Sequence, residues 1–143
     1  MFRRMTDADL PEVLAIEKAG FPQPWSAADF DYELHRNPCS RLYVMTDGGR
    51  LTAFADLWIM FEKAEVANIA VAPAARRRGI GRQMMARLEA CARRAHCESM
   101  SLEVRVTNRP AQGLYDKCGF MTVSIRRDYY ADHSDAYLMM KGI

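Results

Sequence analysis

The spacing of apolar and polar residues changes several times along the chain, and each change predicts a new element. Strand patterns, with alternating or β-branched and aromatic residues, occur at 1–5, 41–46, 51–61, 65–71, 100–106, 120–127 and 135–141. Helix patterns, with apolar residues three and four apart, occur at 7–17, 26–34, 79–95 and 108–118. Antiparallel strands followed by a strand–helix–strand unit predict an α+β fold with a mixed sheet.

Capping and turn residues agree with these boundaries. Ser26 is a helix N-cap residue, and Pro38 ends the helix that follows it. The sequence Asp47-Gly48-Gly49 predicts a tight hairpin turn. Two prolines exclude a helix from 21–25. We expect the helix after Val71 to cross over right-handed to a neighbouring parallel strand.

Length and composition favour one ordinary globular domain over residues 1–143, with half of the residues hydrophobic. The net charge of +2 is too small to indicate a nucleic-acid partner, and we expect none. No apolar run reaches the roughly 20 residues that a membrane helix needs. The first residues also lack the apolar core of a signal peptide. These features predict a cytoplasmic location and no membrane partner.

The four cysteines do not suggest a metal site or a disulfide framework. Cys39, Cys91, Cys97 and Cys118 form no C-x-x-C pair, and no histidines complete a zinc-ligand spacing. Cys91 and Cys118 fall on apolar helical positions, where a free thiol packs as a small hydrophobic group. We expect reduced thiols and no metal.

The segment with the clearest chemistry is the strand that ends near Val71 and the loop from Arg76 to Arg82 after it. Unpaired N–H groups at the start of the next helix, two glycines and several arginines would suit a pyrophosphate. A solvated basic turn explains the same residues equally well. The Walker and dinucleotide motifs are excluded, because Gly81 is followed by Arg82 and methionine stands at residue 84.

Two motifs together resemble a known family. Arg76-x-x-Gly79-x-Gly81 is similar to the coenzyme A loop of the GCN5-related (GNAT) acetyltransferases, and residues 108–120 match their second motif, N-x-x-A-x-x-L-Y-x-x-x-G-F. Within that family the chain is most similar to the ribosomal-protein alanine N-acetyltransferase type. Further matches to that type lie at 24–26, 68–71, 102–105, 125–130 and 135–136.

The resemblance implies a GNAT fold, with a mixed sheet of about seven strands, about four flanking helices and splayed parallel central strands. It implies acetyl-CoA as co-substrate. Three strand residues would face the acetyl group and pantetheine: Ile69, Ala70 and Val71. The pyrophosphate would be bound by Arg77, Arg78, Gly79, Ile80, Gly81 and Arg82, with a further coenzyme contact from Asn108.

The resemblance also implies that Glu103 is the general base and Tyr115 the general acid. Without it, Glu103 would be interpreted as a surface ion pair with Arg105 on the same strand face. Tyr115 would be interpreted as a core tyrosine on the apolar stripe of its helix. The chemistry is suitable, because a carboxylate can deprotonate an attacking amine and a phenol can protonate a departing thiolate.

The resemblance favours transfer to a protein N-terminal α-amine, in particular the alanine of a small-subunit ribosomal protein. No cysteine has an activating setting, so direct attack in a ternary complex is expected. The candidate acceptor-binding aromatics are Trp25, Tyr129 and Tyr130, together with Phe21, although each could equally be a core or rim side chain. The alternatives are a small-molecule or lysine acetyltransferase and a non-catalytic acyl-CoA-binding module.

Overall fold

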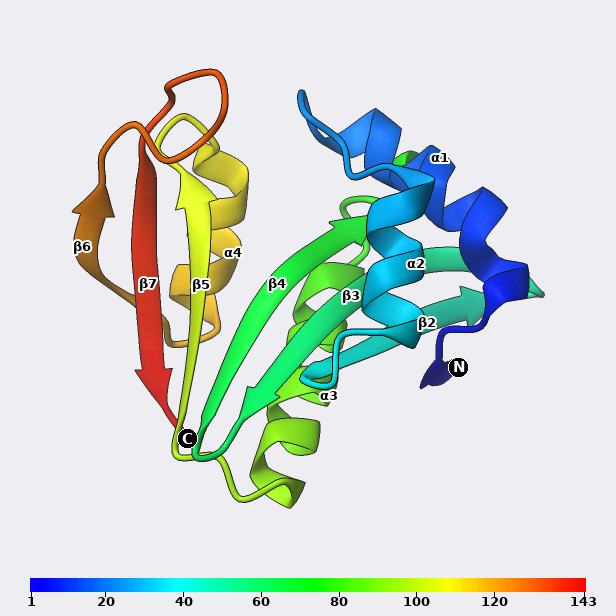
Figure 1. Ribbon diagram of the computed structural model, residues 1–143, viewed down its shortest axis with the longest axis horizontal. Coiled ribbons are helices and arrows are strands. Elements are labelled where there is room, and N and C mark those ends of the chain that lie inside the picture. The colour runs from blue at the N-terminus through cyan, green and yellow to red at the C-terminus, as the bar shows by residue number, and fades with distance from the viewer.

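The computed structural model describes all 143 residues as seven strands and four α-helices (Figure 1). The strands form one sheet in the order β1-β2-β3-β4-β5-β7-β6. The strands are β1 (Phe2–Arg4), β2 (Ser40–Asp47), β3 (Arg50–Met60), β4 (Lys63–Val71), β5 (Ser99–Arg105), β6 (Met121–Arg126) and β7 (Ala136–Gly142). The helices are α1 (Leu10–Gly20), α2 (Ala27–His35), α3 (Ile80–Arg94) and α4 (Arg109–Lys117). The predicted α+β fold with a mixed sheet is confirmed.

The parallel strands β4 and β5 pair only where they begin. Their register covers Lys63–Glu65 against Ser99–Ser101, and no β4 residue after Glu65 pairs with β5. Figure 1 shows the two strands starting together and diverging toward their carboxyl ends. The backbone groups that face this opening have no strand partner, so they are free to bind something else.

A β-bulge in β4 lies just beyond the last β4–β5 pair. Asp56 of β3 opposes Asn68, whereas the next residue, Leu57, opposes Val66, which leaves Ala67 as an extra residue. A bulge bends its strand and increases the local twist. The bulge therefore helps to turn β4 away from β5.

The bulge also reverses which β4 side chains face which side of the sheet. Val66 packs into the core beneath α3, but after the extra residue it is Ile69 and Val71 that do so. Asn68 points instead to the opposite side, where its amide contacts Glu17 of α1. A regular strand would have placed residue 68 on the same face as residue 66.

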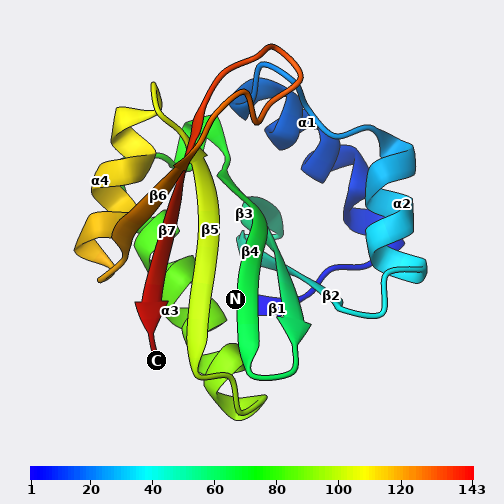
Figure 2. The same cartoon turned by 60° about the vertical axis from the view of Figure 1, so that its left-hand side comes forward.

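Two hydrophobic cores lie on opposite faces of the sheet. The larger core packs α3 and α4 against β2–β5 and includes the buried Met84, Leu88 and Tyr115. The smaller one packs α1 and α2 against β2 and β3, around Phe30 and Phe54. Figure 2 shows the two helix pairs on either side of the sheet.

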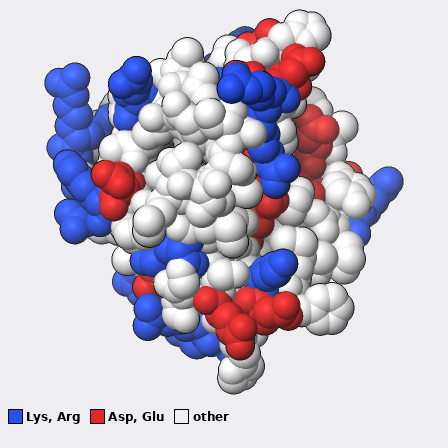
Figure 3. All heavy atoms as spheres, turned by 90° about the vertical axis from the view of Figure 1, so that its left-hand side faces the viewer, with Lys and Arg blue, Asp and Glu red and all other residues white.

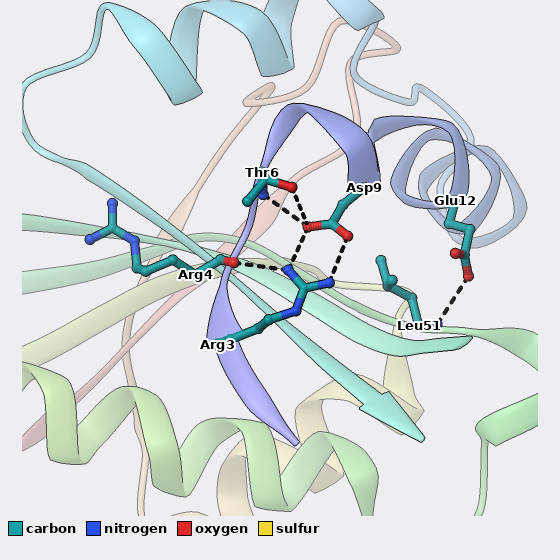
Figure 4. Close-up of polar contacts among 6 residues, drawn as sticks. All are labelled: Arg3, Arg4, Thr6, Asp9, Glu12 and Leu51. Atoms are coloured by element: carbon teal, nitrogen blue, oxygen red, sulfur yellow. Dashed lines mark hydrogen bonds and ion pairs between the residues drawn. The ribbon is translucent and has the colours of Figure 1, made fainter. Parts of the chain in front are cut away.

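Polar contacts fix the amino-terminal segment to the smaller core (Figure 4). Arg3 donates two hydrogen bonds of 2.8 Å to Asp9, and the carboxylate of Asp9 also accepts the backbone N–H of Thr6. These contacts hold residues 7–9 as a 3₁₀ turn, so α1 begins at Leu10, later than the spacing predicts. Glu12 of α1 accepts the backbone N–H of Leu51 at 3.0 Å.

The opposite edge of the sheet is open. Every residue of β6 is exposed, including the side chains of Met121, Val123 and Ile125. Figure 3 shows the side of the molecule that carries β6, where neutral residues cover much of the centre and most basic groups lie nearer the margin. All four cysteines are free thiols. None of the helices combines the length and the apolar character that crossing a bilayer requires.

Candidate active site

A cavity of about 190 Å³ lies where β4 and β5 diverge. Its β4 side is lined by Asn68 and Ile69, and its β5 side by Glu103. The lining also includes Tyr115 of α4, Tyr130 of the β6–β7 loop and residues of the α1–α2 loop. Residues that are far apart in the sequence therefore meet at the one place where the sheet is unpaired.

The α1–α2 loop is held over the cavity by Glu17. This side chain is only 2% exposed. One carboxylate oxygen accepts the backbone N–H of Trp25 and the other accepts the amide of Asn68, both at 2.8 Å. Burial raises the pKa of Glu17, while the two hydrogen bonds favour its charged form. Glu17 thus connects the loop that begins at Phe21 to the bulged segment of β4.

The loop between β4 and α3 ends in a glycine with a left-handed backbone. Gly79 is the N-cap of α3 with φ = 75°, which costs glycine little. Arg77 also has a positive φ, 63°, which an arginine adopts at the cost of strain. No side chain caps α3, so its first N–H groups remain available to an anion.

Gly81 is required for packing. A Cβ atom there would lie 3.0 Å from Leu114 Cδ2 and 3.6 Å from Val71 Cγ2. The missing side chain allows α3 to lie close to α4 and to the end of β4. A Cβ atom on Gly79 would meet nothing within 4 Å, so Gly79 is needed for its positive φ and Gly81 for close packing.

The arginines of this loop are only partly paired. Arg78 lies 3.3 Å from Asp47, and Arg76 donates to the carbonyl of Val71 at 3.4 Å. Arg77 and Arg82 have no carboxylate partner. Their charge is therefore available beside the start of α3.

Glu103 lies in the cavity wall on β5, and its ion-pair partner differs from the one that the sequence suggests. Its carboxylate lies 3.2 Å from Arg126 of β6. Arg105 pairs instead with Asp132 at 2.9 Å, and its guanidinium stacks 4.0 Å from the ring centre of Tyr130. The surface pair between Glu103 and Arg105 does not form, so that interpretation is wrong.

Tyr115 lies both in the core and at the cavity. It is 7% exposed and packs in the larger core beside Phe120, yet it also lines the cavity. Burial raises the pKa of its hydroxyl well above the ordinary tyrosine value. Tyr115 is therefore a neutral O–H donor at physiological pH.

Asn108 is the N-cap of α4. Its side-chain oxygen accepts the backbone N–H of Ala111 at 3.3 Å, and the residue also lines the cavity. Cap formation uses the oxygen and leaves the amide N–H₂ of Asn108 free to donate to a ligand.

The aromatic candidates occupy different positions. Phe21, Trp25 and Tyr130 line the cavity. Tyr129 packs edge-to-face on Tyr130 but is 48% exposed and lies outside the lining. In Figure 2 the β6–β7 loop and the α1–α2 loop lie at the same end of the molecule.

Several residues of the site had no sequence signal of their own. Glu17 appeared only as part of a helical pattern, and Asn68 only within a strand motif. Gln23 of the α1–α2 loop accepts a hydrogen bond of 3.3 Å from Arg105, which joins the two sides of the cavity mouth. The available signal was a glutamate at an apolar position of a helical pattern, just before a loop with two prolines. The histidine, cysteine and acidic side chains form no group that could hold a metal ion.

The chain is similar to known acetyltransferases over most of its length. Residues 10–120 match the model of the acetyltransferase (GNAT) family. A Bacillus subtilis (strain 168) protein, provisionally named a [ribosomal protein bS18]-alanine N-acetyltransferase, is 35% identical over 138 residues, covering 96% of this chain and 91% of that protein. The Escherichia coli (strain K12) [ribosomal protein bS18]-alanine N-acetyltransferase is 33% identical over 122 residues, covering 85% and 81%. The crystal structure of the Escherichia coli ribosomal-protein-S18-alanine N-acetyltransferase superposes with a TM-score of 0.90 at 31% identity, covering 100% of this chain and 93% of that one.

Proposed function

The chain belongs to the acetyltransferase (GNAT) family, and from that premise we propose that it transfers the acetyl group of acetyl-CoA to the N-terminal α-amine of a protein. The observation that carries the proposal is the cavity between the diverging strands, which brings Glu103 and Tyr115 to one space. The named relatives act on the alanine of a ribosomal protein, which supports the same class of acceptor here.

The coenzyme would enter from the side of α3. The uncapped N-terminus of α3, with Arg77, Arg78 and Arg82 beside it, would bind the pyrophosphate together with Gly79, Ile80 and Gly81. Pantetheine would lie along the unpaired edge of β4 at Ile69, Ala70 and Val71, in the way that an added strand pairs with a sheet edge. The free amide of Asn108 would donate a further hydrogen bond.

The acceptor amine would approach from the other side of the opening, between the two loops of the cavity mouth. An α-ammonium group has a pKa of about 7.7–8.0, so much of it must lose a proton before it can attack. Glu103 would take that proton, directly or through a water. The nitrogen then adds to the thioester carbonyl, and an N–H of β4 would stabilise the oxyanion.

The tetrahedral intermediate would collapse by breaking the C–S bond. The electron pair leaves with sulfur, whose pKa as a thiol is about 8.5. Tyr115 would donate its proton toward that sulfur, and burial ensures that the phenol carries it. The nitrogen, which carries one extra proton after the addition, would release it as the amide forms, and this proton would restore the phenol. Trp25, Tyr129 and Tyr130 would contact the first residues of the acceptor.

A turnover assay tests the proposal. A peptide with an N-terminal alanine is compared with an N-terminally blocked peptide that carries a lysine, and mass spectrometry locates the acetyl group. We expect labelling of the alanine peptide alone, because an α-amine is about 2–3 pK units less basic than lysine. Labelling of lysine, or of small amines alone, would identify a different GNAT activity. Binding of acetyl-CoA without turnover on any amine would identify a non-catalytic module.

A further inference from the structure

A second groove, of about 440 Å³, lies far along the sheet from the active-site cavity, between α3 and the edge strand β1 with its neighbour β2. Its lining includes Arg4, Arg41 and Arg94. Arg87 lies next to it, with its guanidinium 5.7 Å from the ring centre of Phe2. None of the proposed coenzyme or acceptor contacts lies in this groove.

Strand and helix periodicity explain why arginines gather here. Because side chains alternate along a strand, Phe2 and Arg4 lie on the face of β1 toward α3, whereas Arg3 lies on the other face and pairs with Asp9. Figure 4 shows the guanidiniums of Arg3 and Arg4 pointing in different directions. On β2, Arg41 lies on the same face as Tyr43, which opposes Arg4 in the register.

Helix α3 contributes arginines to the same groove. Arg87, Cys91 and Arg94 are separated by four and three residues, so they lie on one side of α3. Seven residues along a helix span about 10 Å, too far for Arg87 and Arg94 to hold one small anion together. The groove therefore has basic groups on both walls and along its length.

These guanidiniums have no carboxylate partners. The ion pairs of the molecule include Arg3 but not Arg4, Arg41, Arg87 or Arg94. Arg4 lies over the ring of Tyr43 at 5.4 Å, as Arg87 does over Phe2. Stacking on a ring orients the guanidinium plane and leaves its N–H edges free for an anion.

We propose that this groove binds the phosphodiester backbone of single-stranded RNA. Arginine forms paired hydrogen bonds with phosphate, and each phosphate of a stacked strand is displaced from the last by about 3.4 Å along the strand axis, so a row of arginines about 10 Å long can reach more than one phosphate. The net charge of +2 hides this feature, because acidic residues elsewhere offset a local concentration of positive charge.

The test is fluorescence anisotropy with a labelled 20-nucleotide poly-U RNA over a series of salt concentrations. The double variant Arg87→Gln/Arg94→Gln should bind at least about tenfold more weakly at physiological salt. Its slope of log K against log salt should fall by about 1.4, since each phosphate contact with a single strand contributes about 0.7. Peptide acetylation and the melting temperature should stay at wild-type values.

The matched control is Arg36→Gln/Arg50→Gln, which removes two exposed arginines that also lack carboxylate partners but lie outside the groove. This control should bind RNA within twofold of the wild type. The proposal is overturned if the control weakens binding as much as the groove variant does. Displacement of RNA by saturating acetyl-CoA would also overturn it, since the RNA would then occupy the coenzyme loop. Equally tight binding of polyglutamate would indicate an acidic protein partner instead.

Discussion

The two walls of the active-site cavity hold their charged side chains in different ways. On the β4 side the carboxylates are buried: Glu17 receives two hydrogen bonds. Asp56, behind the bulge, is 0% exposed, and one of its oxygens accepts a hydrogen bond of 2.6 Å from Ser40 while the other has no partner. On the β5 side Glu103 pairs with an arginine whose side chain is 47% exposed, on a strand that is exposed throughout.

This difference suggests a division of work. The β4 wall is fixed by backbone pairing to β3 and by buried hydrogen bonds, so it can hold a coenzyme and a loop in place. The β5 wall carries Glu103, and α4 beside it carries Tyr115, the two groups that would exchange protons. Substitutions on the β4 side should therefore change binding or stability, and substitutions on the β5 side should change the rate of the chemical step.

The largest effect is expected at the end of the β4 wall. Replacing Gly79 and Gly81 together with valine should abolish acetyl-CoA binding in calorimetry. Residue 79 would be strained at φ = 75°, and residue 81 would push α3 away from Leu114. Gly142→Ala is the control, because its Cβ would meet nothing within 4 Å and its φ is ordinary. Unchanged affinity in the double variant would remove this loop from the coenzyme site.

On the β5 wall, Glu103→Gln should lower kcat by about 10²–10⁴ at neutral pH, because the shape is kept but the base is lost. The affinity for acetyl-CoA should hardly change. The rate of the variant should rise steeply from pH 7 to 9, as the α-amine loses its proton without help. A parallel loss of coenzyme binding would show that Glu103 acts in binding, as the β4 wall does, and would remove the proposed difference between the two walls.

Tyr115→Phe should lower kcat by about 10²-fold, at the lower end of the range for acid–base groups. The hydroxyl is the only atom lost, so packing beside Phe120 is kept and the melting temperature should stay the same. Raising the pH above about 8.5 should restore part of the rate, since a thiolate then leaves without a proton. A stability loss as large as the activity loss would assign Tyr115 to the core alone.

Returning to the β4 wall, Glu17→Ala should raise the KM for the peptide about tenfold and leave kcat nearly unchanged. The Trp25 N–H and the Asn68 amide would lose their acceptor, which costs about 1–3 kcal/mol for each buried group left unpaired. Urea denaturation would measure the loss of stability, and steady-state kinetics would measure the KM. Glu17→Gln keeps one oxygen acceptor, so its KM and stability should lie between those of the wild type and of Glu17→Ala. A fall in kcat at unchanged KM would show that Glu17 acts in the chemical step and not in positioning the acceptor loop.

The smallest effect on activity should come from Asp56, behind the β4 wall, where the expected change is in stability. Burial and the neighbouring Glu33 raise its pKa to about 8, so the folded protein holds a proton that the unfolded chain releases above about pH 4. Wild-type stability should therefore fall as pH rises from about 4 to 8. Asp56→Asn should flatten this slope and raise Tm above the wild-type value by more at pH 9 than at pH 5. Parallel Tm curves for the two proteins would contradict the assignment.

The boundaries of most elements could be predicted from short stretches of sequence. Ser26 and Asp29 form the capping box that starts α2, and Gly48 and Gly49 both have positive φ in the β2–β3 turn. Asn108 caps α4 as its position indicates. Each of these features depends on residues within three or four positions of one another, which is why the local pattern was sufficient.

Less of the candidate site could be predicted. The motifs identified Gly79 and Tyr115, because both lie on local strand–loop–helix or helical patterns. The partner of Glu103 was missed, since Arg126 lies two strands across the sheet, with β7 between them. Glu17 was missed for the same kind of reason, because its contact with Asn68 spans 51 residues.

The sequence by itself determined the order and type of the elements, the family motifs and the basic loop before α3. The tertiary structure decided the extra residue at Ala67, the point where β4 and β5 separate and the side chains that meet in the opening. It also brought arginines from β1, β2 and α3 to one groove. Periodicity and capping depend on neighbours in the chain, whereas strand register and helix placement depend on how whole faces pack together.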